Sequence, residues 1–147
     1  MTCTLDSHIG YWMRTLSNHV SHSFERKLAV KGVSVAEWVV LRLLFDGEAF
    51  PSQLAKQMGM TKGAISKVVD RLDSKGLLEI EAGIGDRRSQ TLRLSDSGRS
   101  LTPVLAELAD QNDAEFFGHL NEDERKYLLA IMRRLSDHAN LNIIPAQ

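Results

Sequence analysis

Apolar side chains near the start of the chain recur every three or four positions, which is the spacing of one face of an α-helix. This stripe covers residues 5–31, and Gly32 follows it as a C-terminal stop. Ser34 and Glu37 then have the spacing of a capping box, and the helix they open is apolar on more than one face and should end near Asp46. The pattern predicts a long N-terminal helix followed by a central one.

Two shorter helices and a hairpin come next. Pro51 suits the first position of one helix, Gly59 closes it, and Thr61 can cap the next helix two residues later. Apolar and polar residues then alternate over residues 78–94, on either side of a loop at residues 83–88. This alternation predicts a β-hairpin with a long basic tip.

Two more helices complete the pattern. Ser95 is a good N-cap for a helix that runs towards Leu120, and Pro103 should kink that helix because proline removes one backbone hydrogen bond. Asn121 and Glu124 repeat the capping-box spacing and open the last helix. Long helices are therefore expected on both sides of a compact middle.

The order of these elements defines a fold class. Two short helices joined by a tight glycine-containing turn and followed at once by a β-hairpin are the layout of a winged helix-turn-helix. The chain is predicted to be mainly α with a small β-hairpin wing (α+β), in a single domain over residues 1–147. We expect a winged helix-turn-helix lobe at residues 34–95, flanked by a helical dimerisation lobe made of residues 5–31 and 96–142.

Composition excludes several classes of protein. The chain has 147 residues, is 43% hydrophobic and contains one cysteine, Cys3, so an internal disulfide framework is excluded. The longest apolar run, residues 127–132, is far shorter than the roughly 20 residues that a membrane span requires, and residues 1–6 offer no secretory leader. We expect a cytoplasmic protein that does not enter a membrane.

The net charge of −1 argues at first against a nucleic-acid partner, but the charge is unevenly distributed. Between Lys56 and Arg99 there are nine Lys or Arg against six Asp or Glu, whereas the rest of the chain has nine against thirteen. Positive charge is thus concentrated on the predicted winged segment, as a DNA-binding surface requires.

The second of the two short helices is the one that a helix-turn-helix places in the major groove, with its N-terminal residues on the bases. Its apolar stripe should be buried, and polar side chains project on the opposite side. Lysine can neutralise phosphates or reach guanine, serine can bond base edges, and glycine lets the backbone approach closely. The predicted DNA contacts on this helix are Thr61, Lys62, Gly63, Ser66, Lys67 and Arg71.

The hairpin tip supplies a second predicted contact. Arg87 and Arg88 can reach an adjacent minor groove, whose narrow A·T tracts attract arginine. Asp86 is unfavourable beside phosphate, so we expect it to pair with an arginine and fix the shape of the loop. A glycine turn between helices, or two arginines on a turn, also occurs in proteins that do not bind DNA, but the order and spacing of all three parts together favour DNA binding.

At these residues the sequence resembles the MarR family (multiple antibiotic resistance regulators) over nearly the whole chain. The resemblance is most specific at residues 54–94 and includes the family's wing signature Asp-x-Arg at residues 86–88. It implies a homodimeric transcriptional regulator, often a repressor released by phenolic or other aromatic acids, oxidants or metals. It also implies a recognition helix within residues 61–71 and a wing-tip contact by Arg88. One departure is Phe50, where many members have a Ser or Thr cap, so we expect a weaker cap there.

A homodimer also follows from the limited reach of one recognition helix, which contacts too few base pairs for useful specificity. Two-fold symmetry doubles the readout on a palindromic operator whose half-sites lie roughly one helical turn apart. The terminal helices are the only long elements left to form the interface. The side chains expected to bury against the partner are Leu5, Ile9, Leu16, Leu128, Ile131 and Leu135.

A second face of the first helix carries aromatic and imidazole groups at helical spacing. With an arginine nearby, such groups could hold a small aromatic or phenolic carboxylate by stacking and charge-assisted hydrogen bonds. The candidate effector pocket comprises Trp12, His19, His22, Arg26, Trp38 and Arg42. The alternative interpretation of the same residues is an interface or core.

Other chemistry has less support. His19 and His22 have a metal-like spacing, but no carboxylate or cysteine is placed to join them, and no metal site is predicted. Cys3 is interpreted as an incidental free thiol. The sequence has no nucleophile elbow, phosphate loop, His-Glu-x-x-His or Cys-x-x-Cys, so we expect neither an enzyme nor a cofactor. The alternative function is a winged-helix protein-interaction module without direct DNA readout.

Overall fold

The computed structural model describes residues 1–83 and 86–146, and of residues 86–89 it describes the backbone alone. In chain order, the elements are η1 (Leu5–Ser7), α1 (Ile9–Val30), α2 (Val35–Phe45), α3 (Pro51–Met58), α4 (Lys62–Ser74), β1 (Leu78–Gly83), β2 (Asp86–Leu94), α5 (Asp96–Phe117) and α6 (Glu122–His138). The fold class expected from the sequence, mainly α with a β-hairpin, is confirmed.

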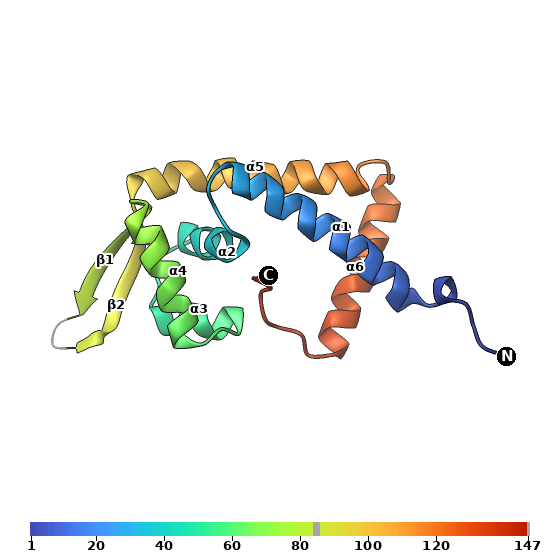
Figure 1. Cartoon of the computed structure of the whole chain (residues 1–147), viewed down its shortest axis with the longest axis horizontal. Helices are drawn as coiled ribbons and strands as arrows, with labels where there is room; N and C mark the ends of the chain where they lie inside the picture. Colours follow the sequence, from blue (N-terminus) through green and yellow to red (C-terminus); the bar gives the residue numbers. More distant parts are fainter. Residues whose placement is uncertain (84–85, 147) are drawn as a thin grey trace.

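The elements form two lobes bridged by α5 (Figure 1). α2, α3, α4 and the hairpin gather at one end, whereas the first half of α1 and α6 lie at the other end. α5 runs along the top of both and packs against α1 and α2. It continues past Pro103 as one helix, so the proline does not break it.

The hydrophobic core lies in the lobe that contains the hairpin. Each of α1 to α5 and both strands contributes buried apolar side chains, but α6 contributes none. The largest fully buried side chains are Leu28, Leu41, Leu44, Leu54, Ile65, Leu72, Leu92 and Leu105. The core therefore holds α4 in place through one face and leaves its opposite face free.

The apolar stripe of the first helix is divided between two environments. Leu28 is fully buried and Phe24 packs on the core, but Ile9 is 80% exposed and Leu16 is also exposed. The predicted helix over residues 5–31 starts later than expected, because His8 has an extended backbone that separates the short turn η1 from α1. In the part of the chain that the structure describes, no helix is long and apolar enough to cross a membrane.

The N-terminal caps predicted for α2, α4, α5 and α6 are present in the structure. Ser34 Oγ accepts a hydrogen bond from the Glu37 N–H (3.1 Å), and Glu37 Oε1 accepts one from the Ser34 N–H (3.2 Å). A second capping box opens α6. At α3, Phe50 supplies no side-chain cap, as expected, but Gln53 Oε1 accepts from the Phe50 N–H (2.8 Å). One of the free donors of that helix end is thereby satisfied.

The hairpin is longer than the sequence analysis predicted. Antiparallel pairing runs from Leu78 opposite Leu94 to Gly83 opposite Asp86, with a register shift between Glu81 and Gly83. The predicted loop at residues 83–88 is therefore wrong in extent, since residues 86–88 belong to β2. Continued pairing satisfies backbone donors and acceptors that a loop would leave to water.

The segment after α6 turns back to the other lobe. The Ile144 N–H donates to the Gln57 carbonyl at the end of α3 (2.9 Å). Ile144 and Ala146 pack against the core. This segment thus connects α6 to the helix-turn-helix directly, besides the connection through α5 (Figure 1).

Candidate nucleic-acid interface

α4 presents one buried face and one open face. Its apolar stripe, made of Ile65, Val68, Val69 and Leu72, is buried. Thr61, Lys62, Gly63, Ser66 and Lys67 are all exposed. Because the exposed residues lie at the start of the helix, the end that a recognition helix turns to the bases is polar, basic and unobstructed by the rest of the described chain.

The tight turn before α4 sets its direction. Gly59 has φ +60° and ψ +34°, a left-handed conformation that costs little only for glycine. Thr61 Oγ1 then accepts a hydrogen bond from the Ala64 N–H (3.1 Å) and caps α4. Ala55, the small residue expected where the two helices cross, is buried.

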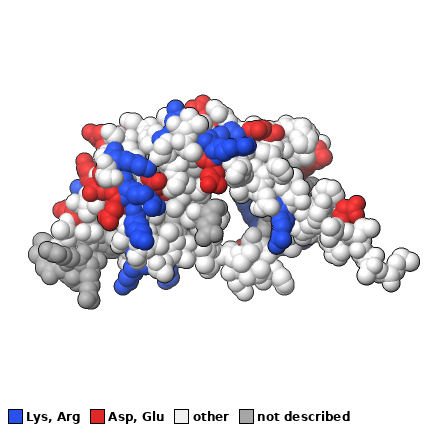
Figure 2. Space-filling view, in the orientation of Figure 1, with Lys and Arg blue, Asp and Glu red and all other residues white. Residues whose placement is uncertain are grey.

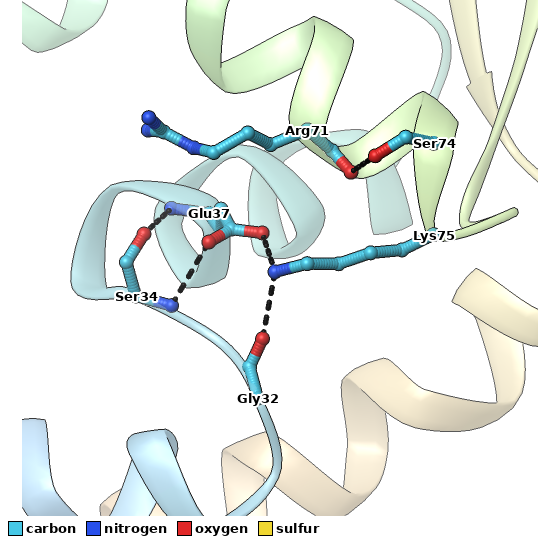
Figure 3. Close-up of polar contacts among 6 residues, drawn as sticks. All are labelled: Gly32, Ser34, Glu37, Arg71, Ser74 and Lys75. Atoms are coloured by element: carbon cyan, nitrogen blue, oxygen red, sulfur yellow. Dashed lines mark hydrogen bonds and ion pairs between the residues drawn. The ribbon is translucent and has the colours of Figure 1, made fainter.

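The far end of α4 is held by a charged cluster that the sequence analysis did not identify (Figure 3). Lys75, the residue after α4, donates through Nζ to Glu37 Oε2 on α2 (2.5 Å) and to the Gly32 carbonyl in the α1–α2 turn (2.7 Å). Glu37 was predicted only as a capping residue. Because Glu37 and Lys75 are far apart in the sequence, no local pattern links them.

Glu37 is charged although it is only 3% exposed. Burial by itself raises the pKa of the Glu37 carboxyl group. The hydrogen bonds from Lys75 and Ser34, together with the positive charge of Lys75, outweigh burial and hold this pKa below its ordinary value of 4.5. The cluster is therefore an ion pair in the folded chain at neutral pH.

Arg71 lies apart from the other predicted contacts of α4. Its side chain extends on the same side of the helix as that of Lys75 (Figure 3). It lines a cavity of about 670 Å³ together with Glu25, Ala29 and Ala146 and residues 32–36 of the α1–α2 turn and the start of α2. The structure thus brings Thr61, Lys62, Gly63, Ser66 and Lys67 together at the open start of α4, whereas Arg71 lies one turn further along, beside the cavity.

The hairpin is fixed at its base by a second charged cluster. Arg93 on β2 lies within ion-pair distance of Glu48 (3.6 Å), Glu79 (3.8 Å) and Glu81 (3.1 Å). Ala49 and Leu92 exchange two backbone hydrogen bonds, which join the α2–α3 connection to β2. The acidic residues at the hairpin base are thereby partly neutralised within the protein. The predicted wing-tip residues Asp86, Arg87 and Arg88 have side chains outside the described part.

Basic side chains follow α4 and reach the lower edge of its lobe (Figure 2). Among the described residues, Lys56, Lys62, Lys67 and Arg71 form no ion pair, unlike Lys75 and Arg93. On the face shown, acidic side chains are prominent around the hairpin, beside the basic ones, and over α5 (Figure 2). Both helices of the helix-turn-helix therefore carry basic side chains that have no ion-pair partner among the described residues.

The predicted effector residues do not enclose a cavity within one chain. Trp12, His19, His22, Arg26 and Arg42 are exposed, and Trp38 is half-buried with its ring edge-on to that of Phe24. The Trp12 indole N–H donates to the Asp6 carbonyl (2.8 Å), and Arg42 pairs with Asp46 (3.0 Å). None of these six residues lines the cavity beside Arg71.

The described part of the chain was also compared with the predictions for a metal site and for the cysteine. No group of three or more His, Cys, Asp or Glu side chains is placed to hold a metal ion there. Cys3 is a free, exposed cysteine near the start of the chain.

The fold and this open basic face define a winged helix-turn-helix protein. Residues 31–89 match the MarR family. This match covers the segment from α2 into β2, where the chain is similar to MarR-family transcriptional regulators.

Relatives and solved structures agree with this assignment. The transcriptional repressor NicR of Pseudomonas putida is 25% identical over 130 residues, which are 88% of this chain and 82% of NicR. The structure of Bordetella bronchiseptica BpsR, described as a mechanism for regulation of DNA binding by 6-hydroxynicotinic acid, has a TM-score of 0.77 at 25% identity, covering 93% of this chain and 99% of that one. A probable transcriptional regulator from Pseudomonas aeruginosa has a TM-score of 0.75 at 26% identity, covering 90% and 99% of the two chains.

Proposed function

We propose that this protein is a sequence-specific regulator that binds double-stranded DNA as a homodimer and represses transcription from a palindromic operator. The observation that carries the proposal is the open face of α4, where Thr61, Lys62, Gly63, Ser66 and Lys67 are exposed opposite a fully packed apolar stripe. Such a face can enter the major groove without any change in the core. The name of NicR as a repressor supports the direction of regulation.

The wing is proposed as a second contact. β2 carries Arg87 and Arg88 on the far end of a hairpin whose base is fixed by Arg93. A basic tip at that position can follow the backbone into the neighbouring minor groove. Asp86 is proposed to hold one of these arginines in place. Arg71, in the last turn of α4, is proposed to contact a phosphate and not a base.

The homodimer is proposed to form through the lobe that lacks a core of its own. The first half of α1 and one side of α6 expose large apolar side chains that no described part of the chain covers. A partner related by two-fold symmetry would bury both faces at once. The exposed side chains are Leu5 of η1, Ile9 and Leu16 of α1, and Leu128, Ile131 and Leu135 of α6.

A small aromatic or phenolic acid is proposed to release the DNA. BpsR, a structural neighbour, has its DNA binding regulated by 6-hydroxynicotinic acid. The face of α1 that carries Trp12, His19, His22 and Arg26, with Trp38 and Arg42 of α2, offers aromatic and cationic groups for such a ligand. Since all of these residues except Trp38 are exposed in one chain, a partner subunit would have to close the pocket.

Selection of bound duplexes from a random pool, repeated with candidate aromatic acids, tests the whole proposal. An enriched palindrome that is lost with one compound is the expected result. Purified protein that enriches no duplex, but captures one stable protein partner, would instead indicate a protein-interaction module.

A further inference from the structure

The cluster of Glu37, Lys75 and Gly32 joins the end of α4 to a much earlier part of the sequence, the α1–α2 turn and the first turn of α2. Lys75 is the residue at the C-terminal end of α4, Glu37 is in the first turn of α2, and Gly32 is in the turn that ends α1. The hydrogen bond from Lys75 Nζ to Glu37 (2.5 Å) reaches α2, and the one to the Gly32 carbonyl (2.7 Å) reaches the end of α1, the helix that leads into the other lobe (Figure 3).

The geometry leaves little freedom at this point. Glu37 Oε1 accepts a hydrogen bond from the Ser34 N–H, and Ser34 Oγ accepts one from the Glu37 N–H, so the capping box orients the carboxylate that Lys75 contacts. Glu37 is buried, whereas the Lys75 side chain is 38% exposed. Apolar packing already holds α4 through Ile65, Val68 and Leu72. The ion pair is thus peripheral to that packing and adds a directional connection to it.

We propose that Lys75 and Glu37 are positioning residues that set the distance between the two recognition helices of the dimer, and so the spacing of the half-sites that the protein accepts. This inference rests on the proposed function. One end of α4 is fixed by the turn at Gly59, and the Lys75 cluster fixes the other end to the α1–α2 turn. α1 continues from that turn into the proposed dimer interface. The angle of α4 relative to the two-fold axis then depends on this cluster.

Half-site spacing is a sensitive measure of that angle. Insertion of one base pair at the centre of a palindrome moves a half-site by roughly 3.4 Å along the duplex and turns it by roughly a tenth of a helical turn. A rigidly held pair of recognition helices cannot follow both changes. A dimer whose α4 helices are held less firmly can adjust to both changes.

The test uses the 147-residue chain and the palindrome that the wild type selects, with the centre of the palindrome unchanged, lengthened or shortened by one base pair. The main variant is Glu37→Gln with Lys75→Met. The amide oxygen of glutamine can still accept from the Ser34 N–H, and methionine keeps the length of the lysine stem. Because both charges are removed together, no charge is left buried without a partner, and the melting temperature should stay near that of the wild type.

We expect the wild type to prefer its own spacing over the altered ones by about tenfold or more, on the scale of one mismatched base pair. The double variant should lose most of this preference, to within about threefold, while its melting temperature is nearly unchanged. Lys75→Met alone should lower the melting temperature because it leaves the Glu37 carboxylate buried without its cation. Lys75→Arg should restore the spacing preference.

The matched control is Glu122→Gln with Lys126→Met, which removes an exposed Glu–Lys pair of α6 whose charged atoms are 3.8 Å apart. It should change neither the melting temperature nor the spacing preference. A double variant at positions 37 and 75 that keeps the full wild-type preference overturns this inference alone. A wild-type chain that selects no duplex overturns the proposed function, and the inference with it.

Discussion

Gly59 is the single residue on which the helix-turn-helix geometry depends most directly. Its φ of +60° is strained for any residue with a Cβ atom, and a Cβ there would lie 2.9 Å from two carbons of the Ile143 side chain. Gly59→Ala should lower the free energy of unfolding by about 1–2 kcal/mol because of the left-handed backbone, with the flexible Ile143 side chain moving aside. Chemical denaturation at a fixed protein concentration measures this change.

Gly10→Ala is the matched control for this substitution. Gly10 lies in the first turn of α1, has nothing within 4 Å of its would-be Cβ, and has no positive φ. Alanine there should leave stability unchanged or raise it slightly. Equal losses of unfolding free energy in Gly59→Ala and Gly10→Ala would show that the left-handed conformation of Gly59 does not cause the destabilisation.

Glu37 makes the stability of the folded chain depend on pH. Its pKa is lower in the folded chain than its ordinary value of 4.5, so the ionised form is favoured by folding. This contribution is fully present above that value and is lost as the pH falls below it towards the lower folded pKa. The free energy of unfolding should therefore decrease less steeply below pH 4.5 in Glu37→Gln than in the wild type.

Denaturant titrations at a series of acidic pH values provide this measurement. Glu107→Gln, on an exposed position of α5, is the control and should keep the wild-type slope. A Glu37→Gln variant with the wild-type slope would show that Glu37 does not carry the acid sensitivity.

At the scale of elements, α4 combines a buried face with a basic exposed one. Lys67→Ala should weaken binding to all duplexes by a similar factor and reduce the salt dependence of the binding constant by about one counterion, because a phosphate contact carries little sequence information. Titrations of labelled duplex at several salt concentrations measure both quantities.

Lys126→Ala removes the same charge from α6, on an exposed side chain outside the proposed DNA-binding face. It should leave the salt dependence unchanged. If Lys67→Ala and Lys126→Ala behave alike, α4 does not face the phosphates. Arg88→Ala should instead affect most strongly the sites with A·T-rich flanks.

At the scale of the whole molecule, the two lobes differ in how they are stabilised. The winged lobe has its own core, but α6 has no buried residue, and Ile131 is among its exposed apolar side chains. Light scattering at micromolar concentration should therefore give about twice the chain mass of 16.4 kDa. Ile131→Glu should shift the protein towards the monomer, because a carboxylate would be buried in the interface.

Val30→Glu is the control for the effect of an added charge. Val30 is apolar and exposed at the end of α1, away from the proposed dimer faces. This variant should remain dimeric. A stable wild-type monomer with an intact fold would contradict the proposed interface.

Local patterns in the sequence determined most of the elements. The capping boxes at Ser34 and Asn121 and the turn at Gly59 were predictable because each depends on residues only a few positions apart. The exposed face of α4 follows from the same helical periodicity. For these features, the chemistry of neighbouring residues is sufficient.

Only the tertiary structure decided how distant residues meet. The pairing of Lys75 with Glu37, the three glutamates around Arg93, and the return of Ile144 to Gln57 all join positions that no periodic pattern relates. The extent of the hairpin was also mispredicted, since strand pairing outweighed the loop composition of residues 83–88. These contacts depend on how helices of defined length pack around a shared core, and local sequence does not encode that packing by itself.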